Sequence, residues 1–249
     1  MIQAAAIGRS LRIYYAPGRA AALDAHLRRF LGPGELGFDL GAHVGDRTAS
    51  FRRLGARALA VEPQPRLARL LRLLFRADPG VAVLATLVGA AEGEAELHLN
   101  SANPTVATAS ADFVAAARDA EGWEGQRWDG TLRRPVTTLD ALIARHGLPH
   151  FAKLDVEGYE AEALAGLSRP LRGLSFEFTT IQRDVARRCL QRLAALGPYR
   201  FNACLGEETR FLFPRPRGAA EMTGWLDALP QTANSGDIYA SLEPGRLLP

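Results

Sequence analysis

Short apolar segments alternate with longer segments of helical periodicity through most of the chain, and this alternation restricts the fold more than any other feature. The apolar segments that we predict to be strands are 37–40, 58–61, 81–85, 151–154 and 174–179. The predicted helices are 19–31, 48–54, 65–77, 138–146, 159–167 and 181–196. Strands that alternate with helices pair in parallel through crossover connections. We therefore expect an α/β fold with a mostly parallel central sheet and helices on both faces.

Two regions depart from this alternation. Residues 100–135 combine turn residues, one short helical stretch and two of the three tryptophans, and they stand between two strand–helix units. Insertions at such places often form a wall of a substrate site, which is what we expect here. Residues 198–249 combine two strand-like pieces, RFLFP and DIYASL, with a helix near 221–229. Because no repeat or low-complexity linker divides the 249 residues, we expect a single domain over 1–249, with sheet elements at its C-terminal end.

The composition argues against several classes of protein. Hydrophobic residues at 47% and charged residues at 23% are ordinary values for a globular chain. No apolar run approaches the ~18 residues that span a bilayer, and the first residues do not have the pattern of a secretory signal. Cys189 and Cys204 form no CxxC pair, so neither a disulfide framework nor a zinc site is indicated. We expect a cytoplasmic protein with no membrane partner.

The basic residues are spread along the chain and the net charge is only +3, which favours a solvated surface over a nucleic-acid interface. Only one of the 30 basic residues, Lys153, is a lysine. This exception indicates that position 153 requires a lysine.

The segment FDLGAHVGDRTASF, residues 38–51, reads as a strand, a tight bend and the start of a helix. Asp39, Gly41 and Gly45 form the pattern D-x-G-x-x-x-G, which lacks the middle glycine of the dinucleotide fingerprint because His43 stands there. Glu62 follows 62 − 39 = 23 residues after Asp39 and could accept hydrogen bonds from both hydroxyls of a ribose. An acid in the bend suits a ligand with an ammonium group, so S-adenosylmethionine fits better than NAD.

Carboxylates end or interrupt four of the predicted strands, at Asp39, Glu62, Asp155 and Glu177. The carboxyl ends of parallel strands meet at one edge of a sheet, where ligands bind. Isolated buried carboxylates are costly, so four of them at one edge indicate a shared site.

At this point the sequence resembles the FkbM-type methyltransferases, a branch of the Rossmann-like S-adenosylmethionine-dependent enzymes. The segments that carry the resemblance lie within about residues 36–180 and are FDLGAHVGDRT, VEPQP, VGAAEGEAEL, PVTTLDALI and FAKLDVEGYEAEALAGL. The chain departs from the family pattern at His43, where asparagine is common. The resemblance implies a class I methyltransferase fold, S-adenosylmethionine as cofactor, and methyl transfer, usually to an oxygen of a small molecule or sugar.

The resemblance also implies roles for individual residues. Asp39, Gly41 and Gly45, together with His43, would form the loop around the methionine end of the cofactor. Glu62 would hold the ribose. Further cofactor contacts would come from Pro63 and Gln64 beside the ribose, from Val88 near the adenine, and from Asp155 beside the methyl group.

Methyl transfer is an in-line displacement that needs an aligned acceptor oxygen and a destination for its proton. Asp155 is the best candidate for the general base or for positioning the acceptor, and Glu157 and Glu177 are further candidates. Alternation along a strand puts Lys153, Asp155 and Glu157 on one side, where the lysine could keep the acids ionised.

Other interpretations of these residues stay open. Lys153 and Glu157 could form only a buried pair that orders the turn at Gly158. His43 could act as a base or as a hydrogen-bonding support for the loop. No metal is expected, since the histidines lack ligand spacing, although Asp155, Glu157 and Glu177 could hold a divalent ion.

The acceptor itself cannot be read from these residues beyond a small molecule or carbohydrate. Trp123 and Trp128 could stack on a sugar or could anchor the insertion to the core. A nucleic-acid N-methyltransferase is disfavoured because no [DN]-P-P-[YF] motif occurs. An NAD-dependent oxidoreductase and a non-catalytic cofactor-binding relative remain as alternatives.

Overall fold

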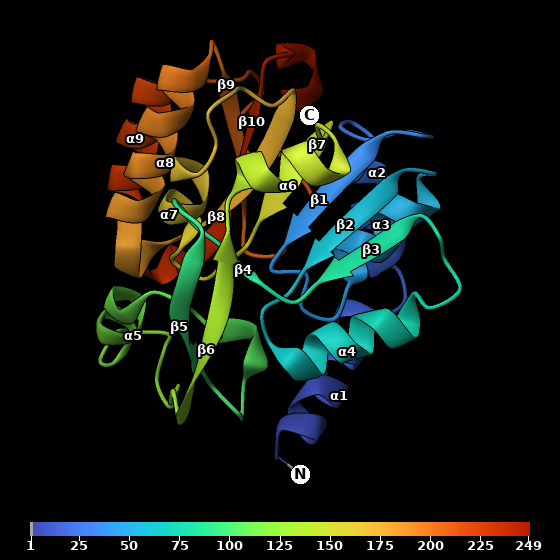
Figure 1. Cartoon of the computed structure of the whole chain (residues 1–249). Helices are drawn as coiled ribbons and strands as arrows, with labels where there is room; N and C mark the ends of the chain where they lie inside the picture. The colour runs from blue at the N-terminus through green and yellow to red at the C-terminus, as the bar shows by residue number, and fades with distance from the viewer. Residues whose placement is uncertain (1) are drawn as a thin grey trace.

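Seven strands form the central sheet of the molecule, which a computed structural model describes for residues 2–249 (Figure 1). They are β1 (Leu36–Leu40), β2 (Arg57–Val61), β3 (Val81–Leu84), β7 (Phe151–Leu154), β8 (Gly173–Thr179), β9 (Arg200–Leu205) and β10 (Ser235–Ser241). Their order across the sheet is β3-β2-β1-β7-β8-β10-β9, and only β10 runs antiparallel to its neighbours. The chain moves outward from β1 to β3 and returns on the other side of β1 as β7. The switch point between β1 and β7 is where open α/β sheets bind ligands.

Helices cover both faces of this sheet (Figure 1). One face packs against α6 (Leu139–His146), α7 (Glu160–Ala165), α8 (Arg183–Leu196) and α9 (Ala219–Ala228) in the larger apolar core. The other face packs against α2 (Arg19–Leu27), α3 (Asp46–Arg53) and α4 (Pro65–Leu74). Leu59 and Val61 belong to the first core while Ala58 and Ala60 face the second, so β2 shows the alternation expected of a strand that is buried on both sides.

All five strands predicted from the apolar runs are confirmed, with ends that differ by no more than one residue. The six predicted helices are also present, although two of them end three or more residues early: the one expected over 19–31 ends at Leu27, and the one expected over 65–77 ends at Leu74. Helix α1 (Ile2–Tyr14) was not predicted. Among residues 2–249, no helix is both long and apolar enough to cross a membrane.

The prediction of a strand at RFLFP, residues 210–214, is wrong, while the one at DIYASL coincides with β10. Phe211 and Phe213 are buried on either side of an exposed Leu212, which gives the alternation of a strand. The main-chain groups of Phe213, however, bond to the side chain of Asn202 in β9, at 3.1 Å for its N–H and 2.8 Å for its oxygen. One backbone bond to β9 is made, from the N–H of Leu212 to the oxygen of Ala203 at 2.9 Å, and the side chain of Asn202 takes the place of the next ladder bonds.

The predicted insertion at 100–135 belongs to a longer segment, residues 87–137, which lies outside the central sheet and has a sheet of its own. We call this segment the excursion. Strands β4 (Leu87–Val88), β6 (Gly130–Thr137) and β5 (Gly93–Leu99) form this three-stranded sheet in the order β4-β6-β5. Between β5 and β6 lie the 3-10 turn η1 (Pro104–Val106) and helix α5 (Ala111–Ala117). The β5–β6 hairpin was not predicted, because its strands are partly exposed and carry many charged residues.

A buried histidine lies within the aromatic part of the second core. His26 is 3% exposed, and its ring centre lies 4.9 Å from that of Phe211 and 4.8 Å from that of Tyr239. Burial lowers the pKa of His26 to about 4. The folded protein therefore holds this imidazole neutral at a pH where the unfolded chain would protonate it.

Replacing His26 with phenylalanine should weaken the acid sensitivity of folding. Between pH 7 and pH 5 the unfolded chain gains a proton at His26 that the folded chain does not, which lowers the free energy of unfolding by about 2 kcal/mol. His26→Phe should lack this part of the loss. Urea unfolding of both proteins at the two pH values measures the difference, and equal pH dependence would contradict a neutral buried ring.

Candidate active site

A pocket of about 770 Å³ lies at the carboxyl ends of the strands around the switch point. Its floor comes from the loops after β1, β2 and β7, and its walls come from β4, from residues 105–109 of the excursion and from Tyr14 of α1. Of the residues predicted to bind cofactor or to catalyse, eight line this pocket: Gly41, His43, Glu62, Pro63, Gln64, Val88, Asp155 and Glu157. Asp39, Gly45, Lys153 and Glu177 do not line it.

Gly41 allows the loop after β1 to touch the end of β7. A Cβ atom at this position would lie 1.7 Å from the backbone oxygen of Asp155, and the φ of Gly41 is 82°. The N–H of Asp155 in turn donates to the oxygen of Leu40 at 2.9 Å. Only glycine satisfies both the spacing and the backbone conformation, so the bend that the sequence indicated is required by this contact.

Asp39 and Gly45 contribute to the same loop without lining the pocket. Asp39 is 1% exposed and accepts a hydrogen bond from the hydroxyl of Thr48 in α3. Burial raises the pKa of Asp39 to about 6, although the bond from Thr48 opposes this shift. A Cβ atom on Gly45 would lie 2.6 Å from the side chain of Leu71 in α4. Both residues hold the loop against the helices and lie outside the pocket lining.

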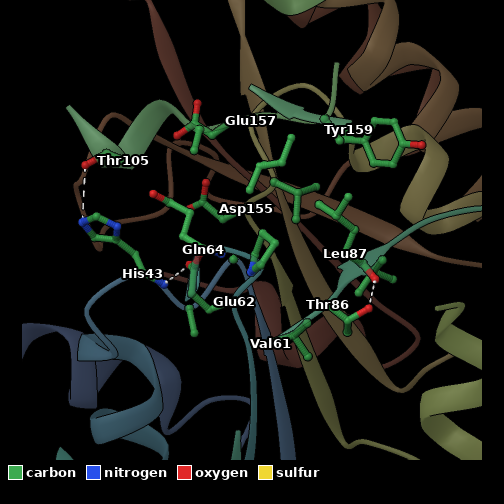
Figure 2. A pocket seen from close by; sticks show the side chains of 18 of the residues that line it. His43, Val61, Glu62, Gln64, Thr86, Leu87, Thr105, Asp155, Glu157 and Tyr159 are labelled. Atoms are coloured by element: carbon green, nitrogen blue, oxygen red, sulfur yellow. Dashed lines mark hydrogen bonds between the residues drawn. The ribbon is translucent and has the colours of Figure 1, made fainter. Parts of the chain in front are cut away.

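Glu62 presents an oriented carboxylate at the end of β2 (Figure 2). One of its oxygens accepts the backbone N–H of His43 at 2.9 Å, and the other accepts the backbone N–H of Gln64 at 2.8 Å. Burial raises the pKa of Glu62 to about 7 despite these two donors. Each oxygen accepts one amide and keeps a free lone pair for a ligand.

His43 and Gln64 connect this carboxylate to the excursion. The ring of His43 lies with its Nε2 3.4 Å from the hydroxyl of Thr105, and the amide of Gln64 donates to the oxygen of Pro104 at 2.8 Å. Burial lowers the pKa of His43 to about 4, so its ring is neutral at pH 7. The contact with Thr105 fits the supporting role, and the lowered pKa makes the ring a weak base.

Lys153 is 2% exposed and lies behind Asp155, with its Nζ 3.2 Å from a carboxylate oxygen of Asp155 and 2.7 Å from one of Asp237. The expected alternative of a Lys153–Glu157 pair is therefore wrong. Burial would raise the pKa of Asp155, but the charges of Lys153 and Arg47 outweigh it, and the pKa is lowered. Asp155 is consequently ionised at neutral pH.

Sequence reasoning missed Asp237, Arg47 and Tyr14. Asp237 is an acid within the apolar strand β10, and an acid in an apolar strand is the signal that identified Asp39. The sequence pattern did not connect this strand with the site, so Asp237 was missed. Arg47 is the second residue after Gly45 and forms ion pairs with Asp46 and Glu207 at 3.3 Å each. Tyr14 packs edge-on against His43 with the ring centres 5.7 Å apart.

Glu157 and Glu177 complete an acidic cluster with Asp155. One carboxylate oxygen from each of the three residues lies within 4.8 Å of the other two. Burial and the neighbouring carboxylates raise the pKa values of Glu157 and Glu177 well above the usual range. The cluster therefore contains one ionised carboxylate, at Asp155, beside two that are hard to ionise.

The two tryptophans of the excursion lie away from the pocket. Trp123 is buried edge-on against Phe113 with the ring centres 5.1 Å apart, and its Nε1 donates to the side chain of Asn234 at 3.0 Å. Trp128 donates to the backbone oxygen of Val106 at 2.9 Å. Of the two expected roles, anchoring the excursion is the one that matches these contacts.

The topology and the pocket together define a class. Counted along the chain, the seven strands of the central sheet take the order 3-2-1-4-5-7-6, with the seventh antiparallel. This is the Rossmann-like class I methyltransferase fold that the sequence led us to expect. The FkbM methyltransferase domain matches residues 39–195, and the chain belongs to the FkbM methyltransferase family.

Several solved methyltransferase structures are similar to this chain at low sequence identity. The O-methyltransferase of Bacillus cereus in complex with SAH has a TM-score of 0.47 and 13% identity, covering 96% of this chain and 91% of its own. A TehB-like SAM-dependent methyltransferase of Corynebacterium glutamicum has a TM-score of 0.47 and 11% identity, with coverage of 95% and 96%. Precorrin-6y C5,15-methyltransferase of Geobacter metallireducens has a TM-score of 0.45 and 14% identity, with coverage of 89% and 85%. No curated protein matches the sequence.

Substituting alanine for Gly41 should disrupt the pocket. The new Cβ would overlap the backbone oxygen of Asp155, and the left-handed conformation alone costs a residue other than glycine about 1–2 kcal/mol. We expect the free energy of unfolding to fall by at least about 2 kcal/mol, with loss of ligand binding at the pocket. Thermal and urea unfolding measure the first effect.

Gly224→Ala is the matched control, because a Cβ on this glycine of α9 would meet nothing within 4 Å. It should leave stability unchanged or raise it by up to about 1 kcal/mol. Equal stability of the Gly41→Ala and Gly224→Ala proteins would show that the β1–β7 contact is not needed.

Proposed function

We propose that the protein binds S-adenosylmethionine in this pocket and transfers its methyl group to a hydroxyl oxygen of a small molecule or carbohydrate. The observation that carries the proposal is the Glu62 carboxylate, which two backbone amides hold in the pocket with its remaining lone pairs free. The two hydroxyls of a ribose match a carboxylate of this kind. Residues 39, 41, 43 and 45 supply the loop for the methionine end, as the family resemblance implies.

The two sides of the pocket differ in the way such a cofactor requires (Figure 2). Glu62, Asp155 and Glu157 lie on one side together with His43 and Gln64. The apolar side chains of Val61 and Leu87 and the ring of Tyr159 lie on the other. Val88 also lines the pocket. The polar side suits the ribose and the amino acid end, and the apolar side suits the adenine.

Asp155 is our candidate for holding the acceptor. Its side chain stands at the end of β7 in the pocket lining, and Lys153 and Arg47 keep it ionised. An ionised carboxylate accepts a hydrogen bond from an acceptor hydroxyl and so orients its oxygen. A hydroxyl becomes strongly acidic as its oxygen gains the methyl group, so even a weak base can take the proton at that stage.

Isothermal titration calorimetry with S-adenosylmethionine, its demethylated product and NAD tests the cofactor. We expect both sulfur compounds to bind and NAD not to bind, and the reverse result would favour an oxidoreductase.

In Glu62→Gln the binding free energy of S-adenosylmethionine should weaken by about 2–4 kcal/mol, because two hydrogen bonds to a charged group are weakened.

Glu96→Gln serves as the control for this variant, since Glu96 lies on the partly exposed strand β5 with 55% of its side chain exposed. Its affinity for S-adenosylmethionine should match the wild type. Unchanged binding in a folded Glu62→Gln protein would remove Glu62 from the ribose site.

Asp155→Asn tests the acceptor side. The variant keeps its shape and should still bind S-adenosylmethionine, but turnover with a hydroxylated acceptor should fall by about 10²–10⁴-fold, the usual effect of losing a positioned acid or base. Because the pKa of Asp155 is lowered, wild-type turnover should show no ionisation of this group between pH 6 and pH 8. Product mass measured over a panel of hydroxylated metabolites identifies the acceptor, and wild-type turnover in the variant would exclude the role.

A further inference from the structure

The acidic cluster at the edge of the pocket has the spacing of a cation site. Asp155 and Glu157 follow β7, Glu177 lies in the neighbouring strand β8, and one oxygen from each lies within 4.8 Å of the others. Oxygen ligands on opposite sides of one ion are about 4.2 Å apart for Mg²⁺ and about 5 Å apart for Ca²⁺. The three carboxylates can therefore reach a single ion with small side-chain movements.

Glu157 gives an independent indication of a ligand. It is 7% exposed and lines the pocket, yet among residues 2–249 its carboxylate has no hydrogen-bond partner, and only its backbone oxygen accepts, from Thr108. One carboxylate oxygen of Glu177 is fully enclosed and has no hydrogen-bond partner. By contrast, the buried acids Glu62 and Glu160 both accept backbone amides. Buried polar groups are almost always satisfied, so the enclosed oxygen of Glu177 indicates a missing partner, and the carboxylate of Glu157 on the pocket side has no protein partner that would prevent it from binding the same ligand.

The surrounding cations do not supply that partner. Lys153 divides its charge between Asp155 and Asp237, and Arg47 pairs with Asp46 and Glu207. Within the described chain, neither Glu157 nor Glu177 forms an ion pair with a lysine, arginine or histidine. A bound cation would supply the charge that the protein does not.

We infer that Asp155, Glu157 and Glu177 bind a divalent cation of the hard, oxygen-preferring class, Mg²⁺ or Mn²⁺. A site built from carboxylate oxygens, without imidazole or thiolate, favours these ions over zinc or copper. Three protein ligands leave further positions for water or for an acceptor oxygen on the pocket side. The role of the ion in orienting the acceptor depends on the proposed function, whereas its binding does not.

Manganese binding to protein treated with EDTA and then freed of the chelator tests the inference. Electron paramagnetic resonance and calorimetry should detect one Mn²⁺ per chain, displaced by excess Mg²⁺. In Glu157→Gln and in Glu177→Gln the affinity for Mn²⁺ should fall at least about tenfold, because a charged ligand is lost. Glu162→Gln is the control, since Glu162 pairs with Arg188 on the half-exposed side of α7, and its affinity should not change.

A second measurement makes the result independent of how the variants fold. Anomalous diffraction from wild-type crystals grown with Mn²⁺ should place the ion between the three carboxylates. Absence of stoichiometric binding, or an ion elsewhere, would overturn the inference and leave Glu157 and Glu177 as protonated carboxyls. A parallel titration with the demethylated cofactor separates the outcomes: cofactor binding without Mn²⁺ binding refutes only the cation site, and Mn²⁺ binding without cofactor binding refutes only the proposed function.

Discussion

The close approach of the loop after β1 to the end of β7 is the contact on which the rest of the site depends. Gly41 has no side chain to separate the two segments, and Asp155 donates its N–H to the last residue of β1. The same loop brings the N–H of His43 to the carboxylate of Glu62. One backbone contact at the switch point therefore sets the distance between the carboxylates of Glu62 and Asp155.

Burial raises the pKa of most acids around this contact, and the local partners decide which of them stays charged. Glu62 has backbone donors and a pKa of about 7, so its charge is balanced near neutrality. Asp155 has Lys153 beside it and remains ionised. Glu157 and Glu177 have neither kind of partner, and burial raises their pKa values well above the usual range. Of these four acids only Asp155 has a lysine beside it, so the charge of the site depends on which carboxylate has a partner.

The sequence allowed the central sheet and the place of the site to be predicted because both depend on local patterns. Continuous apolar runs mark strands that are buried on both faces, and acids at their ends meet at one edge, which brought Glu62 and Asp155 together as expected. Asp39 carries the same signal, yet strand alternation turns it toward Thr48 and away from the pocket. The partner of Lys153 could not be predicted, because Asp237 is 84 residues away and reaches it through an antiparallel strand.

The excursion between β4 and β6 has a consequence for how such proteins diverge. Leu87 and Val88 pair in parallel with Val136 and Thr137, so the first and last residues of the excursion lie side by side. A segment whose ends are pinned together can change in length and composition with little effect on the sheet that it leaves. Selection can therefore remodel the wall that supplies residues 105–109 while the glycine bend and Glu62 stay constant. Within one lineage, the wall and the floor of the pocket can evolve at different rates.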